Sequence, residues 1–492
     1  MKNRQRKTVV VAGASGFVGR ALPDAFDSED VRLVGLTRRP EVVGSLEVGE
    51  KYDEWRRCDL FSRTQTVDAL EGADVGLYLV HSTLPSAYLT QGDPADMDLI
   101  CADNFARAAL HHDLERIIYV GVMAPADPQR RRESSHREVA SVLGSYDTPL
   151  TTLWASMVIG RGGVVARTLE DLVRRLPVMV LPRWTESKTA PVDRQDLAEL
   201  MAGLVEQSRG QGKSYELSGP EVTTYRDLLE RTARLLGKNR TFASVPVNMP
   251  RLSVRWVAAF CGVHPAMVAE FVSQLTVSRF ADPTGQDPLP DELWQPRPLE
   301  QTLRDALGVG TAHEESSAIV AVEPFPDQIR ETEMLRSHHD DDQRRVVRSV
   351  QRLPLPTGRD ARWVAVEYAR WLPRFMRPFI RVERNQDQSL RLFVGPLPWP
   401  LLILEFDPDA SMPERRLYWI RGGLLARRFR WARLEFRVVL DGSAVIAAIH
   451  DFKPRLPWPL YRWTQAKIHR LVMDRFGHHL QTVERQQQQR LP

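Results

Sequence analysis

The feature that most constrains this chain is a short β-branched run that breaks into three evenly spaced glycines. Residues 9–11 are valines, and Gly13, Gly16 and Gly19 follow at intervals of three. The valine run predicts a buried parallel strand, and the composition after Gly19 predicts a helix. A tight turn between them directs backbone N–H groups and the positive end of the helix dipole at an anion that only glycine lets approach. The motif therefore predicts a pyrophosphate-binding loop, with a dinucleotide as its ligand.

A glycine triplet also occurs in ordinary strand-to-helix turns, so its context matters. A second apolar stretch, 31–36, follows at a distance typical of a β-α-β unit, and it leads into Arg38 and Arg39 rather than into an acidic residue. An acidic residue there would bind a ribose hydroxyl, whereas arginine suits a 2′-phosphate. We therefore expect NADP(H) rather than NAD(H). NAD(H) is the alternative, and in a third interpretation both arginines only form a solvated strand end.

The order of later segments resembles the extended and atypical short-chain dehydrogenase/reductases, and especially their NmrA-like branch. The resemblance rests on the glycine motif with Arg38, on Asp59-Leu60 and on a strand-like run at 76–82. It implies a doubly wound Rossmann α/β fold, with adenine beside Asp59-Leu60 and the nicotinamide ribose at the end of the fourth strand. The residues assigned to the cofactor are Gly13, Ser15, Gly16, Phe17, Val18, Gly19, Arg38, Arg39, Asp59, Leu60, Val80, His81 and Ser82.

The chain departs from that family in its catalytic residues. The family's reductases use a Tyr-x-x-x-Lys pair and a hydroxyl at the end of the fifth strand. Here residues 121–123 are Gly-Val-Met, and the helix expected at 134–140 holds no such pair. His136 on that helix is a candidate proton donor, because an imidazole titrates near neutral pH. The alternative is that His136 is a partly exposed polar residue at a helix start.

Two functional hypotheses follow. The first is an NADP(H)-dependent oxidoreductase that acts on an apolar carbonyl or enone substrate. The second is a non-catalytic nicotinamide-cofactor sensor or regulatory binding protein, which the missing Tyr-x-x-x-Lys pair favours.

Cysteine usage and apolar runs bear on the compartment. Cys58, Cys101 and Cys261 are widely spaced without a metal-binding pattern, so we expect a reducing cytoplasm and no metal site. Residues 338–342 are His-His-Asp-Asp-Asp, but consecutive side chains do not easily converge on one ion, so a solvated linker is the better interpretation. The longest apolar run, 392–406, contains three prolines and is too short to span a bilayer.

Charge divides the chain into two parts. Residues 343–492 hold 28 Lys and Arg against 13 Asp and Glu, whereas residues 1–342 hold 39 against 50. An acidic front and a basic rear predict a domain boundary. We expect a Rossmann domain at 1–310 with a substrate-covering part at about 214–308, a linker at 311–344, a basic α+β domain at 345–482 and a disordered tail at 483–492.

The rear domain shows the pattern of a helix, several antiparallel strands and a long terminal helix. Strand-like runs at 433–440 and 444–452 flank Asp441-Gly442-Ser443, a good hairpin signal. The order weakly resembles START-like and polyketide-cyclase-like helix-grip domains, which implies an apolar cavity and a lipid-like ligand.

Seven tryptophans lie among the arginines of this rear segment, most densely at 427–431 and 454–460. The simplest interpretation is a basic domain whose tryptophans fill its core. Arginine beside tryptophan also suits an anionic membrane interface, so peripheral membrane contact is the second interpretation. Nucleic acid is disfavoured as a partner.

Overall fold

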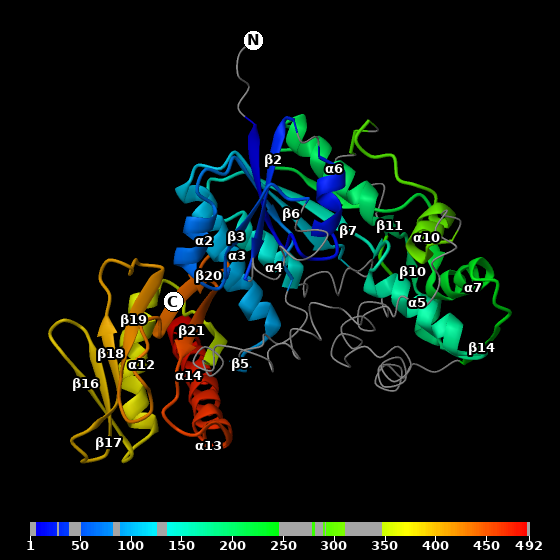
Figure 1. Cartoon of the computed structure of the whole chain (residues 1–492). Helices are drawn as coiled ribbons and strands as arrows, with labels where there is room; N and C mark the ends of the chain where they lie inside the picture. Colours follow the sequence, from blue (N-terminus) through cyan, green and yellow to red (C-terminus); the bar gives the residue numbers. More distant parts are fainter. Residues whose placement is uncertain are drawn as a thin grey trace, which may run out of the picture. The chain divides into compact units, whose positions relative to one another are not determined.

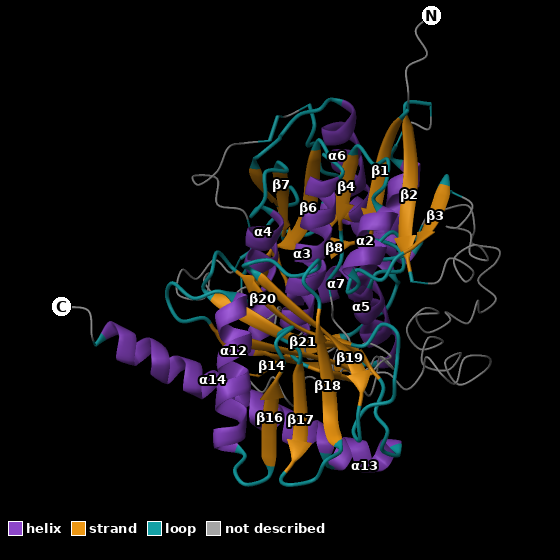
Figure 2. Cartoon of the chain, turned by 90° about the vertical axis from the view of Figure 1, so that its left-hand side faces the viewer, coloured by secondary structure: helices purple, strands orange, loops and turns teal. Residues whose placement is uncertain are grey.

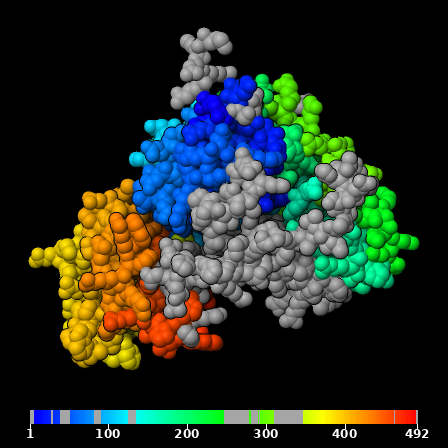
Figure 3. Space-filling view, viewed as in Figure 1, coloured from blue at the N-terminus to red at the C-terminus, as the bar shows by residue number. Residues whose placement is uncertain are grey.

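The structure is a computed structural model, and it describes residues 6–26, 29–38, 51–81, 89–124, 135–245, 278–280, 289–290, 292–309 and 347–489. The chain divides into two compact units. Unit 1 comprises Met1–Thr83 and Cys101–Pro324, and unit 2 comprises Leu84–Ile100 and Phe325–Pro492. Figures 1 and 3 colour most of unit 1 from blue to green and most of unit 2 from yellow to red.

The centre of unit 1 is a seven-stranded parallel sheet in the order β12-β7-β6-β4-β1-β2-β3. Figure 2 shows this order from β7 across to β3. The chain enters at β1, adds β2 and β3 on one side, and then crosses to β4 on the other. This confirms the predicted doubly wound α/β fold. Its strands are β1 (Lys7–Ala12), β2 (Val31–Thr37), β3 (Glu54–Arg57), β4 (Val75–Tyr78), β6 (Arg116–Val122), β7 (Leu150–Ala155) and β12 (Ser214–Leu217).

Helix α6 (Arg194–Glu206) shows how the sheet is covered. Asp193 caps the helix by accepting a hydrogen bond from the Gln195 N–H at 2.7 Å. Leu197, Leu200 and Leu204 recur at helical spacing and are buried in one cluster with Val9 and Val11 of β1. The other helices of unit 1 that border the sheet or its loops are η1 (Gly19–Asp24), α2 (Arg63–Ala69) and α4 (Ser135–Leu143), and α3 (Pro94–His111) begins in unit 2 and ends in unit 1.

A second apolar core of unit 1 lies outside the main sheet. It is formed by α5 (Val164–Arg175), α7 (Tyr225–Leu235) and α10 (Leu299–Leu307), with β9 (Val178–Pro182) paired to β14 (Thr241–Val245). The sequence assigned a covering part to about 214–308, whereas this core also draws on α5 and β9. The remaining short elements are β8 (Val158–Ile159), η3 (Arg183–Glu186), β10 (Lys188–Thr189), β11 (Val192–Asp193) and β13 (Thr223–Thr224).

Unit 2 is built on an eight-stranded sheet in the order β16-β17-β18-β19-β20-β21-β15-β5. All neighbouring pairs are antiparallel except β15 and β5. This confirms the predicted separate domain with an antiparallel sheet; the resemblance to START-like domains stays a prediction. The elements are β5 (Leu89–Gln91), β15 (Val347–Pro354), α12 (Ala361–Phe375), β16 (Ile380–Arg384), β17 (Leu390–Val394), β18 (Pro400–Phe406), β19 (Arg415–Gly422), β20 (Arg433–Val439), β21 (Ala444–Phe452), α13 (Trp458–Trp463) and α14 (Gln465–Gln488).

The two faces of β20 have different roles, because successive side chains point to opposite faces of a sheet. Phe436 faces the helices, and the Tyr368 ring of α12 lies 5.8 Å from it and 5.1 Å from Phe476 of α14. These rings fill space in which the sequence predicted an apolar ligand cavity, so the packing lends that prediction no support.

Glu435, on the opposite face of β20, is fully buried within an ionic network. Arg415 Nη2 and Arg437 Nη2 each lie 2.8 Å from its carboxylate. Burial acts to raise the pKa of Glu435, but these two arginines together with His450 hold it well below its usual range. The carboxylate is therefore ionised inside the sheet.

Two sequence predictions about unit 2 require correction. Residues 89–91 form β5 at the edge of the sheet, although the sequence placed them within the Rossmann domain. The predicted disordered tail was wrong over 483–488, which are helical, because glutamines are good helix formers and Glu484 accepts two hydrogen bonds from Thr357. The linker predicted at 311–344 lies outside the described residues.

Within the described residues, no helix is both long enough and apolar enough to cross a lipid bilayer.

Candidate functional site

The three glycines of the loop after β1 have different structural roles. Gly13 has φ +90°, and a Cβ there would lie 3.0 Å from the Leu79 carbonyl oxygen beyond β4. A Cβ on Gly19 would lie 2.4 Å from the Gly13 oxygen and 2.5 Å from the Ala14 oxygen. Both positions therefore require glycine for the fold itself. Gly16 is exposed, and a Cβ there would meet only the Gly13 oxygen, at 3.0 Å. The fold therefore requires glycine at positions 13 and 19, whereas it restricts the side chain at position 16 much less.

The helix predicted after Gly19 is a six-residue 3₁₀ segment, η1, with Pro23 inside it. The loop is held by hydrogen bonds from Gly16 N–H to the Gly13 oxygen at 2.9 Å and from Arg20 Nε to the Ser15 oxygen at 2.8 Å. So short a segment has little macrodipole. An anion at this loop would therefore be bound mainly by individual backbone N–H groups, and the predicted contribution of a helix dipole is corrected.

Phe17 and Val18 have side chains that pack on the protein. A Cβ on Gly163 would lie 2.7 Å from the Phe17 ring, and the Arg194 guanidinium lies 5.3 Å from the centre of that ring. Val18 packs against the main core. Their side chains fix the loop, so any cofactor contact from these residues would come from the backbone.

The end of β2 carries the basic residue on which the cofactor prediction depends. Arg38 is exposed and directly follows Thr37 of that strand, while Arg39 lies outside the described residues. The register pairs Thr37 with Arg57 of β3, which is also exposed. The sequence analysis did not select Arg57, because only the pairing of β2 with β3 brings it beside the end of β2.

Asp59 and Leu60 follow β3 at the same edge of the sheet. An Asp59 side-chain oxygen accepts a hydrogen bond from the Phe61 N–H at 3.2 Å, and the Leu60 carbonyl accepts one from Asn104 Nδ2 at 2.8 Å. These contacts order the turn beside the end of β2, where the resemblance places adenine.

Beyond β4, the chain brings two histidines together. The Leu79 N–H donates to the Ala12 carbonyl at 2.9 Å, so this segment lies against the start of the glycine loop. Val80 and His81 come next, and the His81 ring lies 4.3 Å from the His136 ring of α4. Ser82 lies outside the described residues. The structure therefore unites one predicted cofactor residue with the one predicted catalytic candidate.

His136 is buried, which rules out the partly exposed polar residue that was its alternative interpretation. Tyr119 Oη lies 2.9 Å from its Nδ1, and Nε2 has no hydrogen-bond partner among the described residues. Burial, followed by the charges of His81 and Arg279, lowers the pKa of His136 to about 3. The imidazole is therefore neutral at physiological pH. The sequence analysis missed Tyr119, because it examined the end of the fifth strand and not its middle.

Two further polar residues border this cluster. Arg279 lies next to Thr189, with its N–H donating to the Lys188 carbonyl at 2.9 Å. Burial raises the pKa of Tyr225 to about 12, against the opposing effects of Arg279 and of a hydrogen bond with Thr189. Arg279 is thus close enough to influence both His136 and Tyr225.

The described residues hold no group of three or more His, Cys, Asp or Glu side chains that could bind a metal ion. The acidic and histidine run at 338–342 lies outside them.

Residues 9–147 match the model of the NAD dependent epimerase/dehydratase family. This match confirms the predicted resemblance of the N-terminal region to NAD(P)-binding dehydrogenase-like proteins. The glycine loop, the switch in strand order between β1 and β4 and the family match define an NAD(P)-dependent epimerase- or reductase-like fold.

Two characterised relatives are similar to the chain. Auxiliary protein GraX of Staphylococcus aureus is 30% identical over 185 residues, which are 36% of this chain and 54% of GraX, so the chain spans about half of that relative. The (4-alkanoyl-5-oxo-2,5-dihydrofuran-3-yl)methyl phosphate reductase of Streptomyces griseus is 25% identical over 277 residues, 53% of this chain and 83% of the relative.

Two solved structures each match 61% of the chain. Triphenylmethane reductase of Citrobacter sp., complexed with NADP(H), is 17% identical with a TM-score of 0.47, and all of it is covered (100%). An NADPH-dependent quinone oxidoreductase of Escherichia coli, complexed with NADPH, is 17% identical with a TM-score of 0.44, and 94% of it is covered.

A pair of glycine substitutions separates loop folding from ligand binding. We expect Gly19→Ala to destabilise unit 1 by roughly 1–3 kcal/mol, because its Cβ would overlap two backbone oxygens. Gly16→Val should leave stability within about 1 kcal/mol of wild type, yet lower NADPH affinity by about a hundredfold or more by filling the anion's space. Urea unfolding and calorimetric titration measure the two effects. NADPH binding by Gly16→Val at wild-type affinity would show that the loop is only a turn.

Proposed function

We propose that unit 1 binds NADP(H) and reduces an apolar carbonyl compound, with an enone as the favoured substrate. The observation that carries this proposal is the cluster formed by buried His136 and Tyr119 with half-buried His81, which lies next to the glycine loop. In open α/β sheets, ligands bind outside the carboxyl ends of the strands where the strand order reverses. That point here lies between β1 and β4, and the cluster is beside it.

The cofactor side of the site fits a dinucleotide phosphate. Gly16 leaves room for a pyrophosphate at the loop, and Arg38 and Arg57 place two exposed guanidinium groups at the ends of β2 and β3. A charged donor pair there suits a 2′-phosphate, which only NADP(H) carries. Bound NADPH supplies a hydride from its nicotinamide ring.

The acceptor side depends on the neutral His136. When Tyr119 Oη donates to Nδ1, the ring proton is on Nε2, the nitrogen that has no partner among the described residues. A neutral imidazole can donate this N–H to a carbonyl oxygen and polarise it without first being protonated. The positive charge of Arg279 nearby would stabilise negative charge that develops on that oxygen.

This arrangement favours enone over ketone reduction. Hydride addition to the β-carbon of an enone breaks its C=C π bond and leaves an enolate, whose α-carbon can take a proton from water. A reduced ketone instead becomes an alkoxide that requires a proton donor on the site. Because the chain lacks the Tyr-x-x-x-Lys pair, we favour the enone, whose reduction does not require a proton donor in the site. The Streptomyces griseus relative is named as a reductase of a 5-oxo-2,5-dihydrofuran, which contains such a conjugated double bond.

A sensor without chemistry is the second candidate. It is favoured by the very low pKa of His136, about 3, which excludes an imidazolium acid at neutral pH. GraX is also named as an auxiliary protein rather than as an enzyme. Tight NADPH binding with no turnover of any enone or ketone would support this candidate.

Cofactor preference tests the role of Arg38. We expect Arg38→Ala to weaken NADPH binding about tenfold to hundredfold, since a hydrogen bond to a charged group contributes roughly 1.5–3 kcal/mol. NADH binding should change less than about twofold. The matched control is Arg32→Ala, which removes an exposed arginine of the same strand that pairs with Glu54 at 2.7 Å. Equal losses for both cofactors in Arg38→Ala would mean that Arg38 acts on the fold rather than on the phosphate.

Turnover tests the role of His136. We expect oxidation of NADPH by a panel of cyclic enones, and a fall in kcat of roughly 10²–10³ in His136→Phe, which has no N–H, as for removal of one oxyanion donor. Tyr119→Phe should cause a smaller fall, because it removes only the group that sets the tautomer. Because the pKa of His136 is near 3, kcat should show no ionisation of this residue between about pH 5 and pH 8. Unchanged turnover in His136→Phe would contradict the assignment.

A further inference from the structure

The loops at the two ends of the unit 2 sheet have opposite charge. Because β16 to β21 form an antiparallel meander, alternate connections lie at the same end. One end carries the segments 376–379, 395–399, 423–432 and 453–457, and we call it the basic end. The other carries 385–389, 407–414 and 440–443, and we call it the acidic end. Figure 2 shows β16, β17 and β18 side by side in this sheet.

The loop segments at each end of the sheet carry charged residues of one sign only. The segments of the basic end contain six Lys and Arg residues and no Asp or Glu, whereas those of the acidic end contain five Asp and Glu residues and no Lys or Arg. The basic residues are Arg377, Arg427, Arg428, Arg430, Lys453 and Arg455. A sheet polarised in this way presents one strongly cationic end to its surroundings.

The basic end also exposes large apolar side chains. Phe379 is 64% exposed and Trp399 is 62% exposed, and Leu397, Leu424 and Trp431 are exposed as well. Leu424 lies next to the Trp399 segment, since its N–H donates to the Pro400 carbonyl at 3.0 Å. The Arg430 guanidinium lies 4.8 Å from the centre of the Trp431 ring. Exposed aromatic and aliphatic side chains here alternate with five exposed arginines, whereas Lys453 is buried.

The loop that carries most of these residues is fixed by backbone contacts. Its N–H groups at Leu425 and Arg427 donate to Leu401 at 3.1 Å and to Lys453 at 2.9 Å. The Arg455 N–H in turn donates to the Leu425 carbonyl at 3.0 Å. Gly423 permits this approach, because its φ is +134° and a Cβ there would lie 2.3 Å from the Leu401 oxygen. The surface is therefore formed before any ligand binds.

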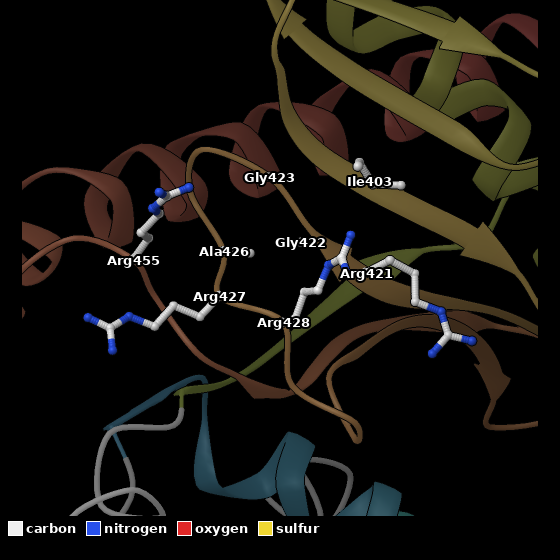
Figure 4. A pocket seen from close by; sticks show the side chains of 8 residues that line it. All are labelled: Ile403, Arg421, Gly422, Gly423, Ala426, Arg427, Arg428 and Arg455. Carbon is white, nitrogen blue, oxygen red and sulfur yellow. The ribbon is translucent and has the colours of Figure 1, made fainter.

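A pocket of about 310 Å³ opens within this loop. Four arginines and two glycines border it, and Figure 4 shows the Arg421 and Arg427 side chains extending away from each other on either side of Arg428. Arg421 is bound to Glu405, with Nε 2.6 Å from the carboxylate. Within the described part of the chain, no carboxylate forms an ion pair with the other three, Arg427, Arg428 and Arg455. The pocket thus offers unneutralised guanidinium groups suited to a phosphate.

We propose that the basic end of unit 2 is a peripheral binding surface for an anionic phospholipid bilayer, with lipid phosphate in the arginine pocket and Trp399 and Leu424 at the depth of the headgroups. Charge complementarity supports this occupant, because arginines attract anionic headgroups and tryptophan favours the interface. The exposed leucines argue against nucleic acid, which is bound by cations and aromatic rings. This surface is independent of the reaction proposed for unit 1.

Co-sedimentation of the full chain with vesicles tests the proposal. The probe is phosphatidylcholine vesicles with one quarter phosphatidylglycerol, compared with phosphatidylcholine alone. We expect binding to the anionic vesicles only, and weaker binding when NaCl is raised from about 0.1 M to about 0.5 M. Arg427→Glu with Arg428→Glu should weaken it at least twenty-five-fold, at about fivefold for each arginine lost. Trp399→Ala should weaken it roughly tenfold.

Matched variants at the opposite end serve as controls. Arg384→Glu with Arg391→Glu makes the same charge change on exposed residues next to the acidic end, and Met412→Ala removes an exposed apolar side chain there. Both should bind vesicles within about twofold of wild type. Equal losses in the control arginine variant would overturn the proposal, as would vesicle binding by wild type that ignores lipid charge. So would tighter binding to duplex DNA than to vesicles.

Discussion

The close approach of the segments that follow β1 and β4 is the constraint on which the rest of unit 1 depends. The Leu79 N–H donates to the Ala12 carbonyl at 2.9 Å, and the Leu79 oxygen leaves only a 3.0 Å space for a Cβ on Gly13. This contact fixes the glycine loop on one side of the switch in strand order and His81 on the other. The cofactor loop and the catalytic candidate are therefore neighbours because two parallel strands are adjacent, although His136 and Gly13 are far apart in sequence.

Local patterns predicted much of this arrangement. The valine run and the glycine spacing predicted β1 and its loop. In unit 2 the predicted strands at 433–440 and 444–452 and the hairpin around Asp441-Gly442-Ser443 agree with the structure in position. Contacts between segments that are distant in the sequence could not be predicted. The contact between the His81 and His136 rings, the pairing of Thr37 with Arg57 and the addition of β5 to the second sheet all depend on register or packing, which no short window of sequence contains.

The surroundings of a titratable residue determine its protonation state, and with it the chemistry that the residue can perform. From sequence, His136 was a candidate acid because a free imidazole titrates near neutral pH. Within the structure, burial keeps it neutral, so the role proposed for it is hydrogen-bond donation and not proton transfer. The same principle applies to Glu435, where surrounding arginines overcome burial and keep a carboxylate ionised. By contrast, the arginines of the basic end are exposed, so their charge is available to a partner.

The central claim is that a dinucleotide binds where β1 and β4 diverge, next to His136. Hydrogen–deuterium exchange of the full chain with and without NADPH tests it most directly. The account predicts that NADPH slows exchange in three segments that are distant in sequence, namely 13–19, 79–81 and 135–140, with a weaker effect from NADH at the end of β2. Unchanged exchange at 13–19 in the presence of saturating NADPH, or protection confined to unit 2, would contradict it.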